Sequence, residues 1–106
     1  MKTYNKLVRD RIPEIIEATG ALCGTRTLSE FEYLQAVNKK LDEELAEYHA
    51  SESIEELADL IEVAYAAANA KGFSAETIDR IREEKAANRG RFDKKIMLLS
   101  VDEVRK

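Results

Sequence analysis

Two long segments with helical periodicity are separated by only a few residues, and this arrangement limits what the chain can fold into. The first segment opens at Ser29 and is predicted to be helical to about His49 or Ala50, and the second runs from Ile54 to Lys71. In the first segment the apolar side chains recur at steps of three and four residues, and they are Leu34, Val37, Leu41, Leu45 and Tyr48. Helices joined by so short a turn pack side by side in opposite directions, so the sequence predicts an antiparallel helical hairpin.

Local signals mark where the helices begin and end. Ser29 and Glu32 have the spacing of a capping box. Either serine of Ala50-Ser51-Glu52-Ser53 can cap the next helix, and Gly72 ends it. Two further helices are predicted, at Arg11–Thr19 with Pro13 in the first turn, and from Ser74 to about Asn88 with Gly90 beyond its end. Residues 20–28 have no helical period and are expected to be an irregular connection.

These elements predict an all-α fold for residues 1–106 as a single domain. The expected architecture is a helical bundle built around the hairpin, with an extended C-terminal tail after Gly90. Four glycines and one proline in 106 residues suit such a helical chain. The apolar residues of the tail are expected to dock onto the bundle or onto a neighbouring subunit, and they are Phe92, Ile96, Leu98 and Leu99.

Composition excludes several classes of function. The net charge of -4 and the pI of about 5.1 argue against binding nucleic acid through bulk charge. The sequence has no apolar run long enough for a membrane span and no apolar segment typical of a signal peptide near its start. A single cysteine, Cys23, fits a reducing compartment, so a cytoplasmic location is expected. The small size and the apolar character of the segment 54–71 favour a homo-oligomer, a dimer or higher.

The two helices of the hairpin carry nearly the same acidic pentapeptide, EELAE at 43–47 and EELAD at 55–59. In an antiparallel hairpin that turns near residues 51 and 52, residues equally far from the turn face each other. Glu47 then lies opposite Glu56, and Glu44 lies opposite Asp59, about one helical turn away. The pairing predicts four carboxylates at two adjacent levels of the hairpin.

Helical geometry places some of these acids where burial is expected. Glu44 projects within the apolar stripe of its helix and Glu56 within the apolar face of the next one, whereas Glu55 and Glu62 fall on the polar side. Buried carboxylates need partners, and neither helix offers a well-placed lysine or arginine at these levels, so a hard divalent cation is the predicted partner. Two other interpretations stay open at this point: ordinary acidic helix surfaces, and a Glu56 that completes a capping box with Ser53.

A di-iron carboxylate bundle does not fit the pattern. Such sites use Glu-x-x-His on facing helices. The one histidine is His49, and position 46, three residues before it, is alanine.

The acidic motifs resemble those of the all-α nucleoside triphosphate pyrophosphohydrolases of the MazG and phosphoribosyl-ATP pyrophosphohydrolase superfamily. The shared pattern is EExxE followed by ExxD on adjacent helices, together with two stretches typical of one small branch, YNKLVRDRIPEII at 4–16 and NRGRFDKKIML at 88–98. The resemblance covers nearly the whole chain. One departure is the interval of eight residues between Glu47 and Glu56, which is shorter than in MazG and implies a tight hairpin.

The resemblance implies hydrolysis of a nucleoside triphosphate between its α- and β-phosphates, which gives a monophosphate and pyrophosphate. It implies Mg²⁺, with Mn²⁺ as a possible substitute, which would bind phosphate oxygens and activate a water molecule. The expected metal ligands are Glu44, Glu47, Glu56 and Asp59, and the expected catalytic residues are Glu43 and Glu47. The expected phosphate-binding residues are Lys6, Arg9, Lys85 and Arg89.

Two alternatives to this function remain. A phosphoribosyl-ATP pyrophosphohydrolase would use the same site on a different substrate. A helical dimerisation or regulatory module would keep the fold without turnover. Acidic positions inside a bundle favour an enzyme, because a module that only associates has no use for them.

Overall fold

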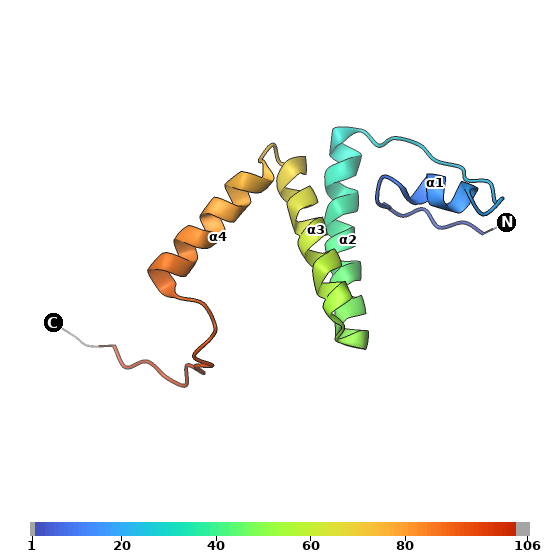
Figure 1. Cartoon of the computed structure of the whole chain (residues 1–106). Coiled ribbons are helices and arrows are strands. Elements are labelled where there is room, and N and C mark those ends of the chain that lie inside the picture. Colours follow the sequence, from blue (N-terminus) through green and yellow to red (C-terminus); the bar gives the residue numbers. More distant parts are fainter. Residues whose placement is uncertain (1, 104–106) are drawn as a thin grey trace.

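The computed structural model describes residues 2–103 and is all-helical in that range (Figure 1). Its helices are α1 (Ile12–Glu17), α2 (Glu30–Ser51), α3 (Ile54–Ala70) and α4 (Ala75–Arg89). The all-α prediction is therefore confirmed. The order of the helices also follows the prediction, although α1 is shorter than Arg11–Thr19 and α2 extends to Ser51, past the expected end at His49 or Ala50.

The capping predictions explain where α2 and α3 begin. The side chain of Ser29 accepts a hydrogen bond from the backbone N–H of Glu32, and the side chain of Glu32 accepts one from the backbone N–H of Ser29, so the capping box is complete. Ser53 caps α3 by accepting a hydrogen bond from the backbone N–H of Glu56 at 3.3 Å. Between these helices Glu52 adopts a left-handed conformation, with φ of 53°, and its N–H donates to the carbonyl of Tyr48.

Helices α2 and α3 form the predicted antiparallel hairpin, which is the main packed unit of the chain (Figure 1). Val37, at the middle of the α2 stripe, is fully buried, while Leu45 of the same stripe is 44% exposed. Helix α4 touches α3 only near their junction and then diverges from the hairpin. Tyr65 of α3 secures that junction by donating a hydrogen bond to Asp79 of α4 at 2.7 Å.

The expected bundle is therefore open in this single chain. The radius of gyration is 19.0 Å, against about 13 Å for a compact domain of this length. The apolar tail does not dock onto the helices of its own chain, since Phe92 is 96% exposed and Leu99 is 88% exposed. Docking within the chain, one of the two alternatives for the tail, is not what the structure adopts.

No helix in the described range 2–103 combines the length and the apolar character needed to cross a membrane.

Candidate metal site

Glu44 is the most deeply buried charged side chain in the described part of the molecule, with 5% of its surface exposed. It lies on α2 two turns after Val37, on the side that faces α3. The sequence prediction that Glu44 projects into the apolar stripe is confirmed. An acid in this position costs free energy unless another group compensates its charge.

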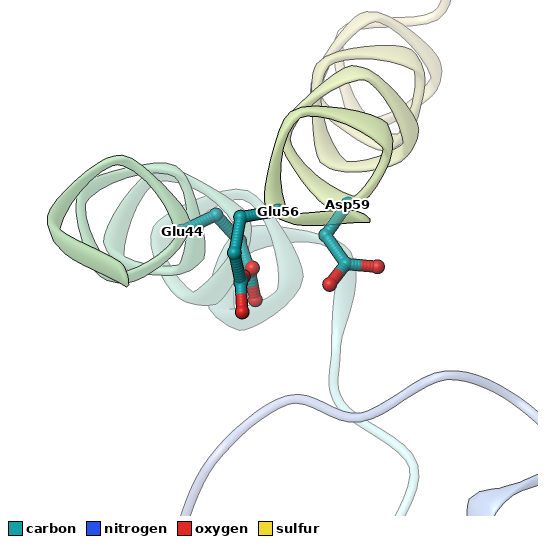
Figure 2. Close-up of side chains that lie close together, drawn as sticks. All are labelled: Glu44, Glu56 and Asp59. Atoms are coloured by element: carbon teal, nitrogen blue, oxygen red, sulfur yellow. The ribbon is translucent and has the colours of Figure 1, made fainter. Parts of the chain in front are cut away.

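Two acids of α3 complete a cluster with Glu44. One carboxylate oxygen from each of Glu44, Glu56 and Asp59 can be chosen so that all three lie within 4.8 Å of one another. Figure 2 shows their carboxylates turned toward the same side of the hairpin. Three oxygens at such separations suit a hard cation such as Mg²⁺, which commonly takes a few carboxylates and keeps waters at its other positions. We call these three residues the acidic cluster.

The capping interpretation of Glu56 does not account for its side chain. In a complete capping box the Glu56 carboxylate would accept a hydrogen bond from the backbone N–H of Ser53. That N–H instead donates to the hydroxyl of Ser51 at 3.3 Å. The Oε2 atom of Glu56 is buried without a hydrogen-bond partner, and so is Oε2 of Glu44.

These two unpartnered oxygens are the observation that most favours a bound cation. Native proteins rarely leave buried polar atoms without partners, and such atoms point to a ligand or ion. Burial raises the pKa of Glu44, and the nearby carboxylate of Glu47 raises it further, while Lys40 opposes the shift. Burial also raises the pKa of Glu56, with added contributions from the carboxylates of Glu47, Asp59 and Glu44. A divalent cation would relieve both the burial cost and the repulsion.

Two basic side chains contact the acidic cluster. Arg9, in the segment before α1, donates a hydrogen bond from Nη2 to Oδ1 of Asp59 at 2.6 Å. The Nζ atom of Lys40 lies 3.4 Å from Oε1 of Glu44 and 3.6 Å from Oε2 of Glu43. The expectation considered basic residues only at the levels of the acids, whereas Lys40 lies on α2 one turn before Glu44 and still reaches its carboxylate.

An open groove of about 870 Å³ adjoins the acidic cluster. Its walls come from the N-terminal segment 6–12, from α2 and α3, and from the first residue of α4. Its charged lining comprises three basic side chains, two members of the acidic cluster and two further acids, and they are Lys6, Arg9, Lys40, Glu44, Asp59, Asp10 and Glu62. A ligand in the groove would meet positive charge and metal-binding oxygens together.

The other predicted site residues lie at different positions relative to the acidic cluster. Lys6 and Arg9, two of the residues expected to bind phosphate, line the groove. Glu47 is exposed and lies outside the cluster of three, although its charge raises the pKa of both Glu44 and Glu56. Glu43 points toward Lys40, with 33% of its side chain exposed.

The predicted phosphate-binding residues of α4 do not reach the acidic cluster within one chain. Lys85 and Arg89 belong to the second half of α4, which lies away from the hairpin, and neither lines the groove. In this respect the expected arrangement differs from the structure, because α4 departs from α3 directly after their junction.

Lys40 is the residue near this site that the sequence interpretation missed. Its spacing carried the signal, since Lys40 precedes Glu43 by three residues and Glu44 by four, the separations at which helical side chains meet. The prediction paired residues across the turn only, so it missed Lys40, which lies one turn before Glu44 on the same helix.

Comparison with known proteins gives one partial match. A segment of 48 residues is 54% identical to a protein of Mycolicibacterium smegmatis described only as uncharacterized. The match covers 45% of this chain and 49% of that relative, so the chain spans about half the length of the protein it matches. No protein-family model matches the sequence, and no solved structure matches it.

Proposed function

We propose that the protein is a Mg²⁺-dependent hydrolase of a nucleoside triphosphate or a related nucleotide, cutting between the α- and β-phosphates. The water oxygen joins the α-phosphorus, the bridging bond to the β-phosphate breaks, and a monophosphate and pyrophosphate leave. The single observation that carries this proposal is the pair of buried, unpartnered carboxylate oxygens of Glu44 and Glu56 beside Asp59. The resemblance of the acidic motifs to the MazG superfamily supplies the reaction.

The residues around the acidic cluster suit this chemistry. Mg²⁺ held by Glu44, Glu56 and Asp59 would supply charge for the phosphate oxygens and activate water. Glu47 is close enough to influence Glu44 and Glu56, and we retain it as a further ligand or as a base that accepts a proton from water. Glu43 is the alternative base, held in place by Lys40.

Individual basic side chains in the groove, together with a bound cation, could hold an anionic substrate. The overall charge of the chain is -4, so a polyphosphate needs local basic groups to approach. Lys6 and Arg9 line the groove beside the acidic cluster and can donate hydrogen bonds to phosphate oxygens. We place the substrate phosphates between these residues and the cation.

We further propose that a second copy of the chain covers its exposed apolar surface. The accessible surface is 9876 Å², whereas a compact chain of 12.0 kDa exposes about 6,000 Å². The excess of roughly 3,900 Å² per chain exceeds the roughly 1,000–2,500 Å² that each partner of an obligate pair commonly buries, so a second copy has ample surface to cover. Ile61 of α3 is 57% exposed, and the tail residues Ile96 to Leu99 are 75–88% exposed. Lys85 and Arg89 would then approach an acidic cluster from the neighbouring copy.

The test of the reaction is an assay of pyrophosphate release from a panel of nucleoside triphosphates, with Mg²⁺ and with a chelator. We expect release that requires Mg²⁺ and that Asp59→Asn abolishes. The control is Glu55→Gln, an exposed acid on the polar side of α3 that does not line the groove. The wild type could fold and bind Mg²⁺ and yet release no pyrophosphate from any nucleotide. That result would contradict the proposed hydrolase and favour the non-catalytic dimerisation or regulatory module.

The test of the assembly is sedimentation equilibrium over a range of protein concentrations. We expect a mass of at least twice 12.0 kDa for the wild type and a smaller mass for Ile61→Glu. A cooperatively folded wild-type monomer at high concentration contradicts this proposal.

A further inference from the structure

Lys40 forms an ion pair with the carboxylate of Glu44, which is also a proposed ligand of the cation. Its side chain is only 18% exposed, and its ammonium group lies 3.4 Å from Oε1 of Glu44. The other oxygen of that carboxylate, Oε2, is buried and has no hydrogen-bond partner. One oxygen of Glu44 thus has a monovalent partner, and the other has no partner.

The groups around the acidic cluster carry an excess of negative charge. Counted formally, five carboxylates carry -5, and the bases that pair with them, Lys40 and Arg9, carry +2; the acids are Glu43, Glu44, Glu47, Glu56 and Asp59. The remaining charge of -3 favours a divalent cation there. An arriving cation and the ammonium group of Lys40 repel each other and compete for Glu44, so binding of the cation weakens the hold on Lys40.

If Lys40 leaves Glu44, its ammonium group can turn into the groove. Lysine has a flexible four-carbon stem and three donors that rotate freely. Lys40 lines the groove together with Lys6 and Arg9. A phosphate bound to a cation in the acidic cluster would therefore lie within reach of the Lys40 ammonium group.

We propose that Lys40 is an exchangeable counter-ion. It neutralises Glu43 and Glu44 when the acidic cluster holds no divalent cation, and it turns to a phosphate oxygen of the substrate when the cation takes its place. This inference rests on the proposed function, because it assumes a cation in the acidic cluster and a phosphate beside it. It assigns Lys40 to substrate binding and makes the order of binding cation first, phosphate second.

The experiment measures two affinities of Lys40→Met by titration calorimetry. The first is for Mn²⁺ alone, and the second is for an α,β-imido nucleoside triphosphate at saturating Mn²⁺. Lys39→Met is the matched control, because Lys39 is the exposed neighbouring lysine on the same helix. Lys40→Arg tests whether positive charge alone restores binding of the nucleotide, and Lys40→Gln is measured in its place if Lys40→Met does not fold.

We expect the two affinities to change in opposite directions. Loss of a competing internal cation tightens Mn²⁺ binding about threefold, the size of a partly exposed ion pair. Loss of one charge-assisted hydrogen bond weakens binding of the nucleotide analogue about tenfold or more. General damage to the fold would weaken both, so parallel losses overturn the inference, and so do affinities equal to those of Lys39→Met.

The result also separates this inference from the function on which it rests. Wild-type protein that does not bind Mn²⁺ contradicts the proposed metal site itself. Wild-type protein that binds Mn²⁺ and releases pyrophosphate, with Lys40→Met behaving like the control, contradicts only the role of Lys40.

Discussion

Replacement of Glu44 by glutamine is expected to stabilise the cation-free protein and to remove its response to Mg²⁺. The substitution keeps the shape of the side chain and removes one negative charge from the acidic cluster. The new amide group can donate a hydrogen bond to the carboxylate of Glu56 or Glu47, both of which lie close enough to influence Glu44. Repulsion between buried acids is then replaced by an attractive contact.

The expected magnitude follows from two opposing contributions. A buried acceptor without a partner costs about 1–3 kcal/mol, and Oε2 of Glu44 is such an atom. Weakening of the contact between Glu44 and Lys40 costs about 1 kcal/mol, because the amide oxygen of glutamine can still accept from Lys40 and Lys40 keeps its contact with Glu43. The net gain is about 1 kcal/mol, which corresponds to a rise of about 4–8 °C in the melting temperature of a domain of this size.

The assay is thermal melting at one fixed protein concentration, with a chelator and with Mg²⁺. A cation at about a hundred times its dissociation constant stabilises the folded state by about 2.7 kcal/mol. Wild type should therefore melt below Glu44→Gln in the chelator and above it in Mg²⁺, so that the order of the two proteins reverses. Glu55→Gln, the same chemical change at an exposed position of α3, should track the wild type in both conditions.

The pH dependence gives a second check on the same reasoning. Because the folded state raises the pKa of Glu44 above its ordinary value of 4.5, the unfolded chain ionises first as the pH rises. Cation-free wild type therefore loses stability as the pH rises above 4.5. The difference in melting temperature between Glu44→Gln and wild type, measured in chelator, should become smaller as the pH falls toward that value. A wild type that melts above Glu44→Gln in the chelator at neutral pH would refute the claim that Glu44 is an uncompensated buried charge.

Three further predictions concern other residues. Glu56→Gln should abolish pyrophosphate release while keeping the fold, with Glu55→Gln as the active control, and retained turnover would remove Glu56 from the ligand set. The side chain of Arg26 and the cap at Ser29 lower the pKa of Glu32 to about 2, so the melting temperature of wild type should exceed that of Glu32→Gln above about pH 4.5, and the gap should close as the pH falls toward 2. Ser29→Ala removes the cap of α2 and should cost about 1 kcal/mol in a urea titration, and an unchanged midpoint would contradict the capping geometry.

The parts of the fold that the sequence predicted well depend on local interactions. The cap at Ser29, the break near Ser51 and the pairing of Glu44 with the acids of α3 all follow from side chains within a few residues of one another or across one short turn. Helical period and turn length set these features before any distant contact forms. The same signals placed Glu44 in a buried position, which the structure confirms.

The parts that differed do not follow from local sequence patterns. The direction of α4 is set by its junction with α3, through Tyr65 and Asp79, and no local pattern in the sequence encodes that angle. The exposure of the tail at Phe92 likewise has no local cause. Apolar character predicts that such residues are buried somewhere, but it does not specify against which surface or which copy of the chain.

The hairpin is built almost entirely from neighbours in sequence, and this has a kinetic consequence. Chains whose contacts are local fold fast, because little loop entropy is lost before the contacts form. Helices α2 and α3 meet across a turn at Glu52, so their pairing should precede every other tertiary event. Association with a second copy, as proposed above, would be slower and would depend on protein concentration. At low concentration the hairpin would then form before the segments outside it are covered, and proteases should cut those segments first, near Gly90.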